Sequence, residues 1–169
     1  MRLSNQAPKP RSPCSGWSLL ELLLVLSLMA ILVATNGPQL FQSWRLQQLH
    51  DERQRLLQAF HFARITSLQK KQKVYLCWHE SCGSPAGFII YLDVNADGTW
   101  QAEDISLQRW QLPKHINLTS NRGDQISFSA AGTSVHAGTF TLCSFGISQG
   151  KSLVLSSGGR VRQVDAPCV

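Results

Sequence analysis

Two arginines near the C-terminus, Arg160 and Arg162, are the side chains of this 169-residue chain best suited to bind a ligand. Residues that alternate along an extended strand point to the same side, so their guanidinium groups would lie about 7 Å apart. Guanidinium forks bind phosphate oxygens in pairs, and Gly158-Gly159 would let another backbone approach closely. The spacing therefore fits neighbouring phosphates of DNA. The alternative is an edge strand whose arginines serve solubility and block pairing with other strands.

The overall charge of the chain adds little to this hypothesis. The formal net charge is +6, but three of the sixteen bases lie in the first eleven residues, ahead of an apolar segment. Without them, thirteen bases face ten acids and the charge is +3. A nucleic-acid site must therefore depend on a local patch, which Lys151, and Lys114 or Arg122, would extend if they share the face of Arg160 and Arg162.

Four cysteines, Cys77, Cys82, Cys143 and Cys168, follow the apolar segment, and Cys14 precedes it. An even set of four fits two disulfides in an oxidising compartment. Three pairings are possible, and we favour Cys77–Cys82, which closes a small loop, with Cys143–Cys168, which ties the tail to a strand. Zinc is the alternative, but the step from Cys77 to Cys82 is longer than the usual ligand spacing and no tight second pair exists.

Residues 93–98 (DVNADG) match the opening of an EF-hand calcium loop, and Asp104 falls at its twelfth position. Strand-like residues precede this segment, however, and the twelfth residue is Asp rather than the bidentate Glu. An Asp/Asn/Gly-rich tip between two strands is typical of a hairpin turn. We therefore expect a turn and no metal site.

No catalytic constellation is evident in the sequence. The five histidines are scattered, and none lies in a nucleophile or metal motif. No glycine-rich phosphate loop is present either. We expect neither an enzyme nor a cofactor.

The N-terminal part contains a carboxylate within an apolar segment. Trp17–Val33 is almost wholly apolar, and with Ala34 and Thr35 it is long enough for one membrane helix. Glu21 lies inside this segment. An unpaired charge there costs roughly 2.5–3.5 kcal/mol on insertion into a membrane, so the presence of Glu21 indicates a functional role. A secretory signal is the alternative, but no small-residue cleavage site follows.

Residues 16–21 (GWSLLE) resemble the leader junction of type IV pilins and type II secretion pseudopilins. The resemblance implies that prepilin peptidase cuts after Gly16 and that Trp17, in place of the usual Phe, becomes the methylated N-terminus. It also implies that Glu21, the fifth mature residue, pairs with the terminal amine of a neighbouring subunit during assembly. Pro38 falls at mature position twenty-two, where it would break or kink the helix just beyond the membrane.

The tail carries a second resemblance. Gly159, Arg160, Val161 and Arg162 are similar to the GRxR motif of FimT-like minor pilins, where it is associated with DNA binding in natural transformation. The resemblance implies a minor pilin that binds extracellular DNA without sequence specificity. The alternative is a structural minor pilin or a GspH-like type II secretion pseudopilin that acts in filament assembly without DNA. Implied partners are prepilin peptidase, other major and minor pilins, DNA and the inner membrane.

A helix and a set of strands must position these residues. From Gln39 to about Lys73 the apolar residues recur at helical spacing. The stripe comprises Leu49, Leu56, Phe60 and Ala63, and it is widened by Trp44, Leu57 and Leu68. The opposite face carries arginines that we expect to be solvated, namely Arg45, Arg53, Arg55 and Arg64.

Short strand-like segments separated by turns follow this helix. They comprise residues 74–78, 87–92, 107–112, 126–128, 139–143, 152–155 and 161–164. One helix followed by consecutive strands predicts an α+β fold, a long N-terminal helix packed on a mostly antiparallel sheet as in type IV pilins. The expected organisation is a leader at 1–16, a transmembrane helix at 17–36 and a head at 37–169. The head would lie in the periplasm of a bacterium, anchored by one span in the inner membrane, and outside the cell once assembled.

Overall fold

The computed structural model describes residues 18–78, 82 and 87–168. Within these residues one long helix, α1 (Leu19–Lys70), is followed by eight strands in two antiparallel sheets. The chain divides into two compact units, one up to Leu40 and one from Phe41 onward. The second unit contains all the strands together with the C-terminal part of α1, and we refer to it as the head.

The first unit contains the N-terminal part of α1, whose leucines are exposed. Within the described residues, no single helix is both long and apolar enough to cross a membrane. The two parts of α1, Leu19–Thr35 and Gln39–Lys70, have the length and composition of a membrane span only when they are taken as a pair. The helical assignment continues through residues 36–38, so α1 does not end at Pro38, and a change in axis direction there stays a prediction.

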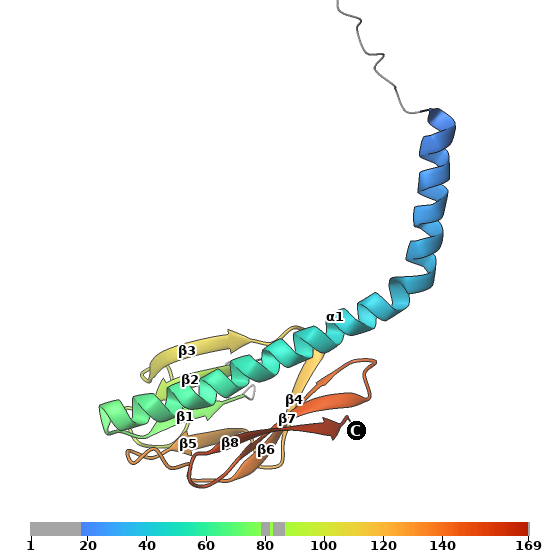
Figure 1. Cartoon of the computed structure of the whole chain (residues 1–169). Helices are drawn as coiled ribbons and strands as arrows, with labels where there is room; N and C mark the ends of the chain where they lie inside the picture. The colour runs from blue at the N-terminus through green and yellow to red at the C-terminus, as the bar shows by residue number, and fades with distance from the viewer. Residues whose placement is uncertain (1–17, 79–81, 83–86, 169) are drawn as a thin grey trace, which may run out of the picture. The chain divides into compact units, whose positions relative to one another are not determined.

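The head contains two four-stranded sheets (Figure 1). The first has the order β3-β2-β1-β5 and is formed by β1 (Val74–Cys77), β2 (Gly87–Leu92), β3 (Ile105–Gln111) and β5 (Gln125–Phe128). The second has the order β4-β6-β7-β8 and is formed by β4 (Ile116–Ser120), β6 (Gly138–Ser144), β7 (Gln149–Leu155) and β8 (Val161–Pro167).

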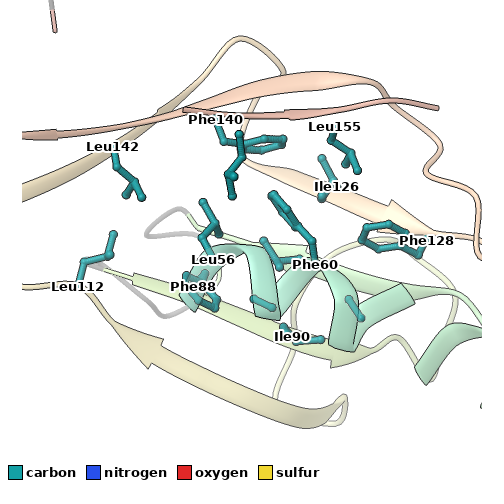
Figure 2. Packing of buried hydrophobic residues seen from close by; sticks show 14 of the residues in the cluster. Leu56, Phe60, Phe88, Ile90, Leu112, Ile126, Phe128, Phe140, Leu142 and Leu155 are labelled. Atoms are coloured by element: carbon teal, nitrogen blue, oxygen red, sulfur yellow. The ribbon is translucent and has the colours of Figure 1, made fainter. Parts of the chain in front are cut away.

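The hydrophobic core joins α1 to both sheets. Figure 2 shows Leu56 and Phe60 of α1 among side chains from the two sheets, including Phe88 of the first and Phe140 of the second. The rings of Phe60 and Phe140 meet edge to face with centroids 5.0 Å apart, the geometry that aromatic pairs prefer. Four positions of the predicted stripe of α1 are buried, namely Leu49, Leu56, Phe60 and Ala63, and Leu57 packs against the core. Trp44 and Leu68, predicted to widen the stripe, are exposed, so the buried face is narrower than predicted.

The predicted α+β architecture and the antiparallel pairing are confirmed. The predicted strand segments all overlap observed strands, with ends that differ by up to three residues. β4 is not among the predicted strands, although Ile116 and Leu118 alternate with polar residues there. The segment is only five residues long and contains Asn117, a residue type that strands disfavour.

Candidate nucleic-acid interface

The two arginines of the C-terminal motif lie at a tight hairpin between β7 and β8. The N–H of Ser156 donates to the carbonyl of Arg160 at 2.9 Å, and the N–H of Gly159 donates to the carbonyl of Ser156 at 2.9 Å. The Ser156 hydroxyl also accepts the N–H of Arg160 at 3.2 Å. These bonds extend the β7–β8 ladder by one residue pair beyond Leu155 and Val161 and fix the backbone of Arg160.

Gly159 packs against the chain itself, and this corrects the expectation that it would let a ligand approach. Its φ is +74°, in the left-handed region that favours glycine, and the residue is buried. A Cβ at this position would lie 2.7 Å from the carbonyl oxygen of Gly132. Arg64 of α1 donates from Nη1 to the Gly159 carbonyl at 3.0 Å. Gly159 therefore anchors the hairpin to α1 and to the loop that contains Gly132.

Arg160 and Arg162 are both exposed. Arg162 is paired with Val154 across the strands, and the ladder continues through Arg160, so alternation places both side chains on one face. That face points away from α1, because Leu153 and Leu155, on the opposite face of β7, are in the core. Within the described residues, neither guanidinium group has a hydrogen-bond or ion-pair partner. Both are therefore available to a phosphate.

The structure does not bring Lys151 to this face. Lys151 is opposite Asp165 in the β7–β8 register, on the side of the sheet that faces α1. Its Nζ lies 2.9 Å from Oδ1 of Asp165, and Nη1 of Arg53 lies 3.2 Å from the same oxygen. The hydrogen bond from Lys151, together with the charges of Lys151 and Arg53, holds the pKa of Asp165 below its usual value. The Lys151 charge is thus paired within the head.

Lys114 lies apart from the two arginines, whereas Arg122 lies at the same end of the second sheet as they do. Lys114 lines a cavity of about 690 Å³ that is also lined by Ile116 and Ser144. Those residues pair at the end of the second sheet that is far from the β7–β8 hairpin. Arg122 packs against Gly138, which pairs with Leu155 beside the hairpin, and its Nε donates to the carbonyl of Ala137 at 2.8 Å.

Of the four arginines of α1 predicted to be solvated, Arg55 is exposed, whereas Arg45, Arg53 and Arg64 are at least partly buried and bonded within the head. Arg45 donates from Nη1 to the carbonyl of Phe145 at 2.7 Å, and the Arg53 and Arg64 contacts are described above. Arg55 pairs with Glu52 at 2.6 Å. A helix docked between two sheets turns most of its circumference toward protein, and long side chains then find carbonyls and carboxylates at the rim.

Glu52 is a buried acid, with 4% of its side chain exposed. Burial raises the pKa of Glu52, and this effect is larger than the opposing effect of Arg55. Its second carboxylate oxygen, Oε2, has no hydrogen-bond partner within the described residues. Glu52 is not among the residues predicted from the sequence to be functional, because a Glu on an arginine-rich helix is expected to lie on the surface.

Both favoured disulfides, Cys77–Cys82 and Cys143–Cys168, are present. The second ties the end of β8 to β6 across Gly150 of β7. A Cβ on Gly150 would lie 2.9–3.0 Å from the two sulfur atoms, so a glycine is needed beneath this disulfide.

The Asp93 segment forms the connection between β2 and β3, which pair antiparallel as the predicted hairpin requires. Its carboxylates bind backbone amides: Asp93 accepts from the N–H of Gly98 at 2.7 Å, and Asp104 accepts from the N–H groups of Val94 and Gln101. Among the residues described, no group of three or more His, Cys, Asp or Glu is placed to hold a metal ion.

The residues of the predicted processing junction are only partly within the structure. Gly16 and Trp17 lie outside the described residues. Glu21 lies in the first turn of α1 and is exposed. Its predicted pairing with a neighbouring subunit stays a prediction.

Comparison with known proteins gives matches of two kinds. The family model described as type II transport protein GspH matches residues 52–159, which ends one residue before Arg160. Two crystal forms of the type IV minor pilin FimU from Pseudomonas aeruginosa strain PAO1 share the fold, with TM-scores of 0.57 and 0.55 and 20% sequence identity. They cover 70% and 68% of this chain, and 89% and 91% of their own chains are covered. No curated protein matches.

Proposed function

The chain belongs to the GspH family of type II transport proteins, and from this premise we propose that it is a minor pilin whose head binds DNA through Arg160 and Arg162. The family supports a minor pilin or pseudopilin role in a type IV pilus or a type II secretion system. DNA binding is the finer part of the proposal. It would serve the uptake of extracellular DNA in natural transformation.

The observation that supports DNA binding is the difference between two groups of arginines. Arg45, Arg53, Arg55 and Arg64 of α1 are bonded to groups of the head itself. Arg160 and Arg162 are exposed, share a face and have no partner among the described residues. Unpaired guanidinium groups on a fixed backbone bind phosphates without further ordering of the chain.

The proposed binding is weak for one subunit and independent of base sequence. Phosphate contacts carry no sequence information. Two such contacts give a slope of about −1.8 for the logarithm of the association constant against the logarithm of salt concentration. Useful affinity then requires several subunits along one DNA molecule, because linked sites bind far more tightly than single ones.

The test uses the full-length protein in a nonionic detergent and two fluorescently labelled duplexes of unrelated sequence. Anisotropy titrations should give similar dissociation constants for both duplexes. Changing Arg160 and Arg162 together to Gln should abolish most binding and remove the salt dependence. The matched control changes Lys70 and Lys114 to Gln, which removes the same charge elsewhere on the head and should retain most binding. Equal loss in the two double variants would reject the motif as the binding site.

A second candidate function is a structural subunit, either a minor pilin or a GspH-like pseudopilin that acts in filament assembly without DNA. The family match is compatible with it, because the matching family is described as a type II transport protein. It predicts that wild-type protein shows no DNA binding in the titration above. The Arg160 and Arg162 double variant would then support filament assembly as well as wild type does.

Both functions share the same maturation and membrane anchor. We propose that prepilin peptidase cuts after Gly16, that Trp17 becomes the methylated N-terminus, and that Glu21 pairs with the terminal amine of a neighbouring pilin. The apolar N-terminal part of α1 would span the inner membrane, with the head in the periplasm before assembly and outside the cell afterwards. The exposed leucines around Glu21 support this placement.

A further inference from the structure

The second sheet has one face turned away from α1, and its residues follow from the strand registers. Thr119, Thr141, Ser152 and Val164 form one row across the four strands. Thr139, Val154 and Arg162 form the adjacent row across three of them. We call these residues the outer face. Thr141 and Ser152 share a hydrogen bond at 2.8 Å, and Thr119 donates to the carbonyl of Thr141.

The outer face carries no negative charge. The four strands of the second sheet contain one acidic residue, Asp165. It lies on the opposite side, level with Lys151 and near Arg53, and 62% of its side chain is exposed. A phosphate that approached β8 from the α1 side would therefore meet a carboxylate. A phosphate that approached from the outer face would meet Arg162 and neutral hydroxyl or aliphatic side chains.

We propose that DNA lies across the outer face, so that its backbone crosses β8 at Arg162 and continues over Val154 toward Thr139. This inference rests on the proposed DNA-binding function and specifies its surface. Strands lie about 4.8 Å apart, so Thr139 lies about 10 Å from Arg162, a distance between one and two phosphate spacings along the backbone. Threonine hydroxyls are common donors to phosphate oxygens, and a flat sheet face without acids lets a duplex lie close.

The test compares one added negative charge on each side of β8. Thr139→Glu places the charge on the outer face, two strands from Arg162, and Thr139→Gln is its neutral control of the same size. Gln163→Glu places the charge next to Arg162 in the sequence but on the side that faces α1, and wild type is its neutral control. Full-length proteins in nonionic detergent are titrated against a labelled duplex at 50 mM salt.

Thr139→Glu should weaken binding about fivefold relative to Thr139→Gln, because a like charge near a phosphate costs about 1 kcal/mol in water. Gln163→Glu should weaken binding less than twofold, because the sheet separates its charge from the DNA and salt screens it. An equal or larger effect of Gln163→Glu would overturn the inference in favour of an approach along the β8 edge.

Two further outcomes separate this inference from the proposed function. If neither Glu substitution affects binding while the Arg160 and Arg162 double variant loses it, DNA binding stands and the outer face is wrong. If wild type does not bind DNA, the proposed function fails and this inference fails with it. Thermal unfolding checks that each variant is folded, and Thr119→Glu, an exposed position on the same face, replaces Thr139→Glu if the latter unfolds early.

Discussion

Replacing Gly159 with alanine should lower the free energy of unfolding of the head by about 3 kcal/mol, whereas the adjacent Gly158 should accept the same change. The two glycines differ in backbone conformation and in surroundings. Gly159 has a φ of +74° and is enclosed by Gly132 and Arg64. Gly158 is not among the residues with positive φ, and the nearest atom to its added Cβ would be Oγ of Ser156 at 3.9 Å.

The magnitude follows from two costs that act together at Gly159. A residue with a Cβ in the left-handed region costs about 1–2 kcal/mol. The Cβ would also lie 2.7 Å from the carbonyl oxygen of Gly132, and moving backbone to relieve such overpacking costs about 1–3 kcal/mol. At Gly158 neither cost arises. Alanine there restricts the unfolded chain and should add about 0.4–1 kcal/mol of stability.

The assay is urea unfolding of the full-length protein in nonionic detergent, followed by the fluorescence of the three partly buried tryptophans of the head, Trp78, Trp100 and Trp110. The midpoint should fall for Gly159→Ala and stay or rise for Gly158→Ala, with the same dependence on urea in all three proteins. Equal midpoints for the two variants would refute the reasoning, because only the contacts and φ of Gly159 distinguish them.

Three other predictions concern separate parts of the chain. Because burial raises the pKa of Glu52, the folded state binds its proton more readily than the unfolded chain, and wild-type stability should rise as pH falls from 7 toward 4.5. Glu52→Gln should therefore be more stable than wild type at pH 7, and the difference in stability between the two proteins should decrease as the pH is lowered. The measurement is the unfolding temperature of both proteins as a function of pH, and a difference that does not change with pH would contradict the prediction. Changing Cys143 and Cys168 to Ser should lower the free energy of unfolding by about 3.5 kcal/mol, since this disulfide links residues 25 apart. Removing Cys77–Cys82, which links residues 5 apart, should lower it by about 2 kcal/mol. Denaturant titrations that give the reverse order would contradict the assumption that loop length sets the stabilisation. Gly16→Ala should leave unprocessed precursor in the membrane, and mass spectrometry that finds normal mature protein would reject the cleavage site.

The strands could be predicted where burial is regular and local. Residues 87–92 are predicted without error because they form an uninterrupted apolar run, and the structure buries all six. Ile89 and Tyr91 point away from the main core but are covered by Trp100 and the Cys77–Cys82 region. A continuous apolar run predicts a strand buried on both faces, and the strand is found here in an antiparallel sheet.

The arginines of α1 could not be placed from the sequence, because their partners lie far along the chain. The bond from Arg64 to Gly159 joins residues 95 positions apart, and the bond from Arg53 to Asp165 joins residues 112 apart. Helical spacing shows which side of a helix is polar, but it does not show whether a second sheet covers that side. The sequence therefore predicts the faces of α1 and does not predict the docking of β8 against it.

Lys151 illustrates the same limit on the scale of one strand. Lys151 lies on β7, the strand that pairs with the strand of Arg162, but strand register decides the face, and a shift of one residue would reverse it. The pairing of Lys151 with Asp165 places both on the side of α1. No feature of the sequence fixes that register in advance, because the hairpin of residues 156–160 allows several turn types.

In the GRxR motif, Gly159 is part of the packing of the fold, whereas the side chains of Arg160 and Arg162 are not. Gly159 is fixed by its φ, by Gly132 and by Arg64, so its replacement should change stability. The guanidinium groups of Arg160 and Arg162 make no contact that holds the described head together, so their replacement should leave stability within about 0.5 kcal/mol of wild type. A loss of DNA binding in the double arginine variant can therefore be assigned to the missing charges and not to an unfolded head. If that variant instead unfolded at a much lower urea concentration, the arginines would be part of the structure, and the main support for a ligand at this hairpin would be lost.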